Sequence, residues 1–322
     1  MKKTTKIWLV IAASLVLLGS IVFVGVMSML KWDFTKLSTG KYETNHYEIN
    51  EDYKNISIVT DTADIVIIPS ENLKTSVICH EPENMKHAVM LKDDTLVIEV
   101  IDTRKWYEYI GINFGGANIT VYIPQEEYGW LSVRSDTGDV EISKDFTFES
   151  IDIQGSTGNV AKYASALKNV TIKLTTGNIG AESITVDELD LSVSTGGIRI
   201  SNVTCQSDVK INVSTGKASL TNIACKNVIS RGNTGDIFLK TVIAAEGFLI
   251  KRSTGDVKFD ECDAAEIFVE TDTGEVVGSL NTDKVFIAET STGRIDVPNT
   301  TTGGRCEIIT STGNIKIDVT QP

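Results

Sequence analysis

The first thirty residues carry one long apolar run. Residues 7–30 hold no charged side chain, whereas Lys2, Lys3 and Lys6 precede them. As an α-helix this run would be about 36 Å long, enough to cross a hydrocarbon core of about 30 Å. Because the lysines lie at its amino-terminal end, the positive-inside rule places the amino terminus in the cytoplasm and the rest of the chain outside. The pattern predicts a signal-anchor helix; a cleaved signal peptide, with its shorter apolar run, is the alternative.

A Thr-Gly pair recurs through the rest of the chain at steps of 19 or 20 residues. The residue before each threonine is always Ser, Thr, Asp or Asn. A fixed period of this length is typical of solenoid proteins, in which each repeat stacks on its neighbours. We expect the glycines to form structural turns, because glycine tolerates positive φ. These turn glycines are Gly138, Gly158, Gly177, Gly196, Gly216, Gly235, Gly255, Gly274, Gly293 and Gly313.

Apolar side chains keep the same period on both sides of each pair. Positions seven and five residues before the glycine, and two and four residues after it, are mostly apolar. This alternation predicts two strands with one buried face each, joined by the Thr-Gly turn. Because like residues recur at equivalent positions, stacked parallel coils are favoured over a hairpin meander. We predict an all-β, single-stranded parallel β-solenoid (β-helix) of about ten flattened, two-sided coils of 19–20 residues.

The segment before the repeats breaks the period but still contains strand-like stretches. Terminal repeats of solenoids are atypical, so we interpret residues 45–130 as an N-terminal β cap with the first irregular coils. Residues 131–322 then form the β-solenoid repeats, residues 31–44 a linker, and residues 1–30 the cytoplasmic stub and transmembrane helix. Within the cap, Ala63 stands where a repeat turn would have glycine.

Two parts of the predicted fold are candidates for contacts with partners. Trp106, Tyr107, Tyr109 and Phe114 cluster in a glycine-containing stretch, which is either packing for the cap or a partner loop. The last coil, residues 308–319, has no evident polar cover. An uncovered strand edge invites pairing, so self-association through this C-terminal edge is a second possibility.

Composition and charge narrow the classes of partner. Hydrophobic residues make up 41% of the chain and charged residues 23%, which is typical of a folded protein. The formal net charge is −13, so the chain would repel nucleic acid and we expect no nucleic-acid binding. We expect the chain to contact the membrane through residues 7–30, and any further partner to be an unidentified protein or glycan.

Catalytic and metal-binding patterns are missing from the sequence. The three histidines lie in the cap segment, and no Cys-x-x-Cys pair or nucleophile elbow occurs. Asp139, Asp236 and Asp256 follow turn glycines, but Lys217 and Arg294 take the same position in other repeats, which argues against a row of calcium ligands. We therefore predict no catalytic residue, no cofactor and no metal, and a protein that is not an enzyme.

Two of the five cysteines share a position in the repeat. Cys205 and Cys225 each lie nine residues after a turn glycine, so we expect them to stack in adjacent coils. A disulfide is conceivable at that spacing, and a reduced pair is favoured because the cysteine count is odd.

At this point the sequence resembles a known family. The segments Ile-Ser-Ile-Val-Thr-Asp-Thr-Ala-Asp-Ile-Val-Ile at 56–67, Leu-Val-Ile-Glu-Val at 96–100 and Ile-Thr-Val-Tyr-Ile-Pro at 119–124 precede the Ser-Thr-Gly repeats. This order is similar to the "putative adhesin" family of β-strand-repeat bacterial envelope proteins, a domain of unknown function. The resemblance covers about residues 45–320. It implies a β-helical envelope protein with adhesion as the expected role, and it supplies no catalytic residues.

These observations lead to one main hypothesis and two alternatives. The main hypothesis is a single-pass cell-membrane protein whose extracytoplasmic β-solenoid acts in non-enzymatic adhesion or interaction at the bacterial envelope. The first alternative is a self-assembling structural protein or an accessory of an envelope-stress system. The second and weaker alternative is a polysaccharide-active enzyme on a β-helix, which would need a cleft lined by carboxylates.

Overall fold

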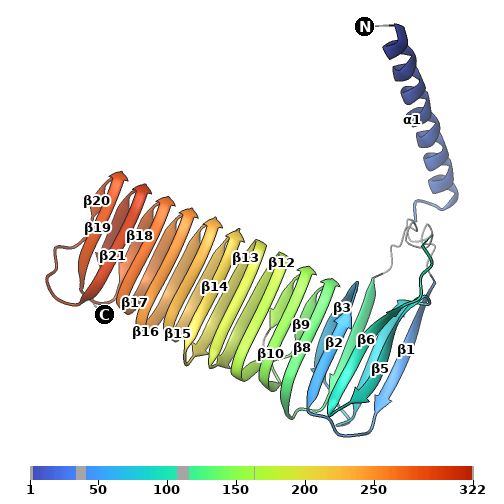
Figure 1. Ribbon diagram of the computed structural model, residues 1–322, viewed down its shortest axis with the longest axis horizontal. Coiled ribbons are helices and arrows are strands. Elements are labelled where there is room, and N and C mark those ends of the chain that lie inside the picture. Colours follow the sequence, from blue (N-terminus) through green and yellow to red (C-terminus); the bar gives the residue numbers. More distant parts are fainter. Residues whose placement is uncertain (1–2, 34–40, 107–115, 163, 321–322) are drawn as a thin grey trace.

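One apolar helix begins the chain. The computed structural model describes residues 3–33, 41–106, 116–162 and 164–320. Helix α1 (Lys3–Met29) has a mean hydropathy of 2.7 in its most apolar stretch and packs no part of that stretch against the rest of the protein. By length and composition it can cross a membrane, and a signal sequence would meet the same criteria. Figure 1 shows it apart from the β structure, beyond strand β1.

The rest of the described chain forms a β-solenoid of about nine turns, which confirms the predicted fold class. The strands are β1 (Tyr42–Ile49), β2 (Asn55–Thr60), β3 (Ala63–Pro69), β4 (Thr75–Pro82), β5 (Met85–Lys92), β6 (Thr95–Asp102), β7 (Ala117–Ile123), β8 (Glu127–Thr137), β9 (Val140–Ile142), β10 (Thr147–Thr157), β11 (Val160–Lys162), β12 (Ser165–Val186), β13 (Glu188–Cys205), β14 (Asp208–Thr215), β15 (Ala218–Thr234), β16 (Ile237–Thr254), β17 (Val257–Thr273), β18 (Val276–Leu280), β19 (Lys284–Thr292), β20 (Ile295–Asp296), β21 (Gly304–Thr312) and β22 (Ile315–Val319).

Each coil pairs with the next in parallel and in register. Between β12 and β13 the paired residues fall into three runs, which begin at Asn169, Thr176 and Ile184. The break before the third run is a second turn, six residues after the glycine. The residue there has a φ of 51–55° in five successive coils, and these residues are Ser183, Asn202, Asn222, Thr241 and Glu261. The coil therefore has a third short segment beside its two main faces, which the expectation of a two-sided coil did not include because it counted only the Thr-Gly turn.

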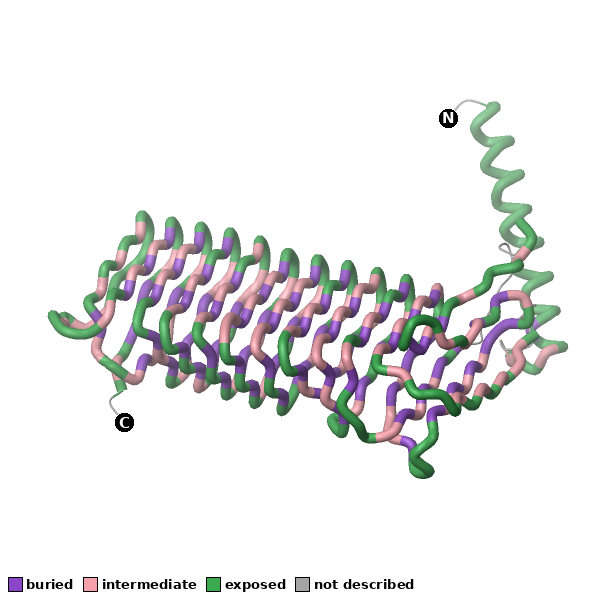
Figure 2. The backbone as a smooth tube through the Cα atoms, turned by 60° about the horizontal axis from the view of Figure 1, so that its bottom comes forward, coloured by how far each residue is buried: buried purple, intermediate pink, exposed green. Residues whose placement is uncertain are grey.

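The core is a set of apolar columns inside the coils. Figure 2 shows buried residues alternating with intermediate and exposed ones along the inner coils. At the position two residues after the turn glycine, Val140, Ile198 and Ile315 are at most 3% exposed. Because equivalent positions lie directly above one another, each column buries one kind of side chain along the length of the solenoid.

The order of coils in space departs from the order in sequence at both ends. Strands β2 and β3 lie between β6–β7 and β8–β9, so an early segment inserts under a later one. At the other end, β21 and β22 insert between β17–β18 and β19–β20. The outermost coil is thus residues 284–297, and the expectation that residues 308–319 are the exposed last coil is wrong. Local period cannot reveal such an insertion, because both coils carry the same pattern.

The cap joins the two faces of the solenoid at its amino end. Strand β4 runs antiparallel to β1 and β7 on one face, and β5 runs antiparallel to β6 on the other. Side chains then draw the outer strands together: the Tyr47 hydroxyl donates to the His87 carbonyl at 3.1 Å, and Lys86 pairs with Glu43 at 2.6 Å. The ammonium of Lys86 lowers the pKa of Glu43. The amino end of the solenoid is closed by these contacts.

Candidate functional site

A groove runs along one face of the solenoid from the cap. This axial groove has a volume of about 720 Å³. It is lined by the position four residues before each turn glycine, here called its floor, and by small residues such as Gly155, Ser156 and Ser194. The floor residues are polar and stack in consecutive coils: Arg134, Gln154, Lys173, Ser192 and Asn212. Because coils lie roughly 4.8 Å apart, the groove presents a polar group at each such step.

Charged side chains form ion pairs at the cap end of the axial groove. Arg104 contacts Asp61 at 3.1 Å and Asp102 at 2.6 Å, and Asp61 lines the groove. Further along, Arg134 donates to the Gln154 side-chain oxygen at 3.3 Å. Arg134 and Lys173 are exposed, so they offer cationic hydrogen-bond donors to whatever lies in the groove.

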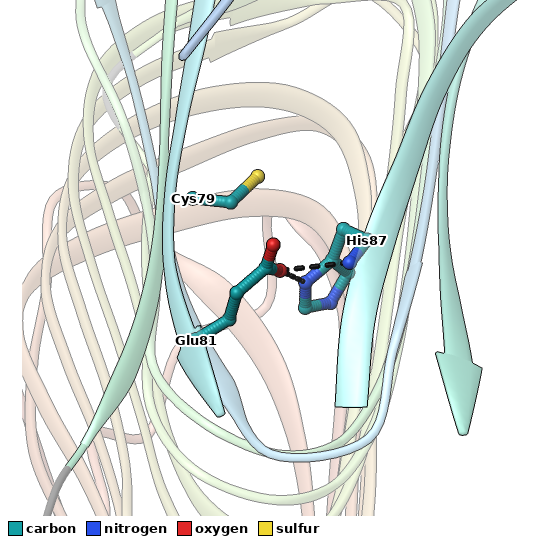
Figure 3. A group of neighbouring side chains, drawn as sticks. All are labelled: Cys79, Glu81 and His87. Atoms are coloured by element: carbon teal, nitrogen blue, oxygen red, sulfur yellow. Dashed lines mark hydrogen bonds and ion pairs between the residues drawn. The ribbon is translucent and has the colours of Figure 1, made fainter. Parts of the chain in front are cut away.

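A buried polar cluster lies beside the groove, inside the cap. Figure 3 shows Cys79 and Glu81 on β4 facing His87 on β5. The Glu81 carboxylate accepts from His87 Nδ1 at 2.6 Å and from the His87 backbone amide at 2.7 Å. On its other oxygen it accepts from Asn45 at 2.8 Å. The far ring nitrogen of His87 meets the Thr60 hydroxyl at 2.9 Å.

The cluster combines ligand atoms that suit a metal ion with a chain of hydrogen bonds from Thr60 through His87 to Glu81, which resembles a proton relay. The ligand atoms of Cys79, Glu81 and His87 lie within 4.8 Å of one another, so these three residues could hold a metal ion. The hydrogen bonds nevertheless satisfy both Glu81 oxygens and both His87 ring nitrogens. The side chains of His87 and Glu81 are 1% and 0% exposed, so a substrate cannot reach them. The arrangement ties β4 to β5.

Lys162 and Arg252 are cationic side chains buried inside the solenoid. Lys162 is 0% exposed and donates to the Ala164 carbonyl, and burial lowers its pKa to about 7. Arg252 folds over Gly232 and donates to the Ser230 hydroxyl at 2.9 Å; burial lowers its pKa to about 10. A Cβ atom on Gly232 would lie 1.8 Å from the guanidinium, so the glycine makes room for the arginine.

The turn glycines stack in one column with very close backbones. At nine of the ten, φ is between 122° and 159°, a region that side chains rarely adopt. A Cβ atom at any of the ten would lie 1.6–2.2 Å from the carbonyl oxygen of the residue stacked on its cap side. At Gly138 that neighbour is Ala63, which therefore takes the glycine position of its own coil.

Acidic residues after the turn glycines bind backbone amides. Asp139 accepts from the Asn159 amide at 2.7 Å, and Asp256 accepts from the Glu275 amide at 3.0 Å. Lys217 pairs with Asp236 at 3.0 Å, and this contact lowers the pKa of the Asp236 carboxyl. The carboxylates of this column thus serve the stacking of the coils.

The remaining sequence candidates are placed as follows. Residues 107–115, with Tyr107, Tyr109 and Phe114, lie outside the described residues, and Trp106 is 77% exposed. Cys205 and Cys225 are in adjacent coils, and all five cysteines are free and buried. Burial raises the pKa values of these thiols to about 11 or 12.

Sequence reasoning missed the buried cluster and the burial of Lys162 and Arg252. A signal for the first existed: Cys79 and Glu81 are two residues apart in a strand and so share a face, and His87 follows on the next strand. Lys162 likewise stands four residues after a turn glycine, at an otherwise apolar position.

Comparison with known proteins identifies the family. The Toastrack DUF4097 family model matches residues 53–213 and 204–322. A solved "putative lipid binding protein" from Parabacteroides distasonis ATCC 8503 is 18% identical, with a TM-score of 0.51, and the match covers 87% of this chain and 98% of that one. A "putative adhesin" from the same organism is 12% identical, with a TM-score of 0.50 and coverage of 87% and 98%. No curated protein matches the chain. At these identities the likeness to solved structures extends to the fold.

Proposed function

Because this chain belongs to the Toastrack DUF4097 family and begins with a helix long enough to span a membrane, we propose that it is an anchored, non-enzymatic interaction protein of the bacterial envelope. Helix α1 crosses the cell membrane with its amino terminus in the cytoplasm, and the solenoid lies outside the cytoplasm. The lysines before the helix support this orientation.

The axial groove is the surface that we assign to binding. The observation that carries this assignment is the row of stacked polar side chains along its floor, which begins at the cap and continues over five coils. Such a row offers hydrogen-bond donors and acceptors at regular steps to an extended polar polymer, either a glycan or an unfolded polypeptide. Arg134 and Lys173 share the lining with Asp61 and Asp136, so the groove offers charged groups of both signs to a polar ligand.

Orientation is tested with single introduced cysteines in intact cells. Ala245→Cys and Thr4→Cys both place a thiol at an exposed position, on opposite sides of α1. The native thiols are buried and contribute little background. A membrane-impermeant maleimide should label Ala245→Cys and spare Thr4→Cys. Labelling of Thr4→Cys alone would overturn the orientation.

Binding is tested with the full chain in lipid nanodiscs and an envelope fraction from cells that lack it. Co-sedimentation should fall severalfold for Lys173→Glu and stay unchanged for Lys316→Glu, an exposed lysine on another face. Treating the envelope with a protease or with a glycan-degrading enzyme identifies the class of partner. Equal binding by both variants would rule out the axial groove.

A further inference from the structure

The end of the solenoid farthest from the cap has unpaired strand edges. Its outermost coil, here called the terminal coil, consists of β19, β20 and the residues to 297. Strand β19 pairs with β21 and β20 pairs with β22, each on one side. Among the described residues no strand pairs with their outer edges. Inner strands such as β13 have partners on both sides, so the terminal coil leaves backbone donors and acceptors free for another strand.

The apolar side chains of the terminal coil are also uncovered. Ile295 is 43% exposed, whereas Ile315 and Val276, at the same position in the next coils inward, are 0% exposed. Phe286 is half-buried, whereas Cys306, its equivalent in the adjacent coil, is 0% exposed. The columns of the core therefore end at an open face, where further apolar surface would be buried if another coil were added.

A second copy of the same terminal coil fits this end. A twofold axis perpendicular to the solenoid axis would continue both faces at once, each as an antiparallel strand pair. If the β20 pairing is centred on Ile295, then Arg294 of each copy lies opposite Asp296 of the other, so the charges are complementary in both directions. The cap does not offer such a partner, because its outer strands are drawn together by the Glu43–Lys86 and Tyr47–His87 contacts.

We propose that the protein forms a tip-to-tip homodimer through its terminal coils. The interface is short, because Pro298 follows β20 and cannot donate a ladder hydrogen bond, and because Thr300 donates to the Lys284 carbonyl and covers the start of β19. A short interface makes the dimer reversible. If α1 is the anchor proposed above, the two anchors lie at opposite ends of the dimer, and the dimer would join two facing membranes.

The first test measures self-association of the full chain in detergent micelles by light scattering over a range of protein concentrations. The protein mass should double as concentration rises. Arg294→Asp and Asp296→Arg should each weaken the dimer about tenfold or more, because like charges then face each other twice across the axis. The double variant, which swaps the two charges, should restore it. Both positions are exposed, so these variants are expected to fold.

The second test reads the geometry. Ile295→Cys should give a disulfide-linked dimer under mild oxidation, because the two positions face each other on the axis. Ala245→Cys, exposed on the side of the solenoid, should not. A monomer at all concentrations, or equal cross-linking by both variants, would overturn the proposal, as would a charge swap that fails to restore association.

A vesicle assay separates this inference from the proposed function. Two populations of vesicles that carry the full chain should aggregate, and Arg294→Asp should prevent this. Dimers in micelles without vesicle aggregation would retain the tip-to-tip contact and overturn the joining of two facing membranes. Envelope binding that depends on Lys173, without any dimer, would retain the proposed function and overturn the tip-to-tip contact.

Discussion

The two ends of the solenoid differ in how the last strands of the stack are covered. At the amino end, antiparallel strands β1, β4 and β5 extend the two faces, and side chains then bring the outer strands together. At the other end the terminal coil keeps the geometry of the repeat and stops, with Ile295 and Ile287 exposed. The difference shows that the repeat does not close itself. Closure needs additional sequence of a different kind, which among the described residues lies in the cap.

The ends also share one feature. Each contains a coil inserted out of sequence order, β2–β3 at the cap and β21–β22 at the other end. The segment that leaves the stack must return past a neighbouring coil, so the covalent connections at each end pass over a coil that lies between. Among the inner coils, from β12 to β16, each coil is joined directly to the coil that it pairs with.

The largest effect is expected at a stacked turn glycine inside the repeat. Gly177→Ala would place a Cβ atom 1.7 Å from the Gly158 carbonyl oxygen at a φ of 139°. We expect a loss of about 3–6 kcal/mol in the free energy of unfolding, from backbone strain and overpacking together. Chemical denaturation measures it.

Two control variants make this result specific. Gly180→Ala is in the same coil, but its nearest neighbour would be 3.9 Å away, so its cost should be small. Ala63→Gly should also change little, because the column of stacked turn glycines ends at that coil. A large loss from Gly180→Ala would show that the effect reflects strand propensity and not the stacked turn.

The next largest effect concerns the closure of the cap. Glu81→Ala leaves His87 and Asn45 without their buried acceptor, and breaking a buried pair of this kind costs about 3–5 kcal/mol. We expect the melting temperature to fall, and hydrogen exchange to rise in β4 and β5 before the inner coils. Glu83→Ala, an exposed neighbour, serves as the control. Uniform loss of protection along the whole solenoid would mean that the cap does not unfold as a separate unit.

A matched pair of isoleucines compares the interior with the open end. Ile198 is 1% exposed and Ile295 is 43% exposed at the same position of the repeat. Ile198→Ala should cost about 2–5 kcal/mol by opening a cavity, whereas Ile295→Ala should cost less than about 1 kcal/mol in the monomer. Thermal unfolding at dilute concentration measures both. Equal costs would show that the terminal coil is covered in the monomer.

The smallest effect is a gain near the cap. Because the folded pKa of Lys162 is about 7 and its unfolded value is 10.5, the unfolded chain binds the extra proton between these values. The destabilisation is therefore complete below pH 7 and decreases as pH rises toward 10.5. Lys162→Met should raise stability by about 1–4 kcal/mol at pH 6 and remove this slope. Unfolding curves at pH 6 and pH 9 measure the change; an unchanged slope would mean that Lys162 is not the responsible group.

The repeat could be predicted from the sequence because each coil carries the same pattern of glycine and apolar positions. The glycine column and the apolar columns recur ten times, so the fold class follows from the period. The cap could be recognised only as a departure from that period, since its antiparallel pairings β1–β4 and β5–β6 join segments with no shared motif.

The rest depends on contacts that no local pattern encodes. The insertion of β21–β22 is invisible because its coil carries the same Ser-Thr-Gly turn as its neighbours. The axial groove depends on which coils stack against the cap, and Thr60, Glu81 and His87 meet only after three separate strands have assembled. The burial of Arg252 could be predicted only together with Gly232, which makes room for it in the adjacent coil.

The interlocked ends have a consequence for how such a protein can change in evolution. Duplicating or deleting one unit of 19–20 residues among β12–β16 would leave the cap and the terminal coil as they are. Each such event would alter the length of the molecule by roughly 4.8 Å, the spacing of one strand. If α1 is the anchor proposed above, the distance between the membrane and the terminal coil can therefore change in whole steps of one coil, without a change at either end.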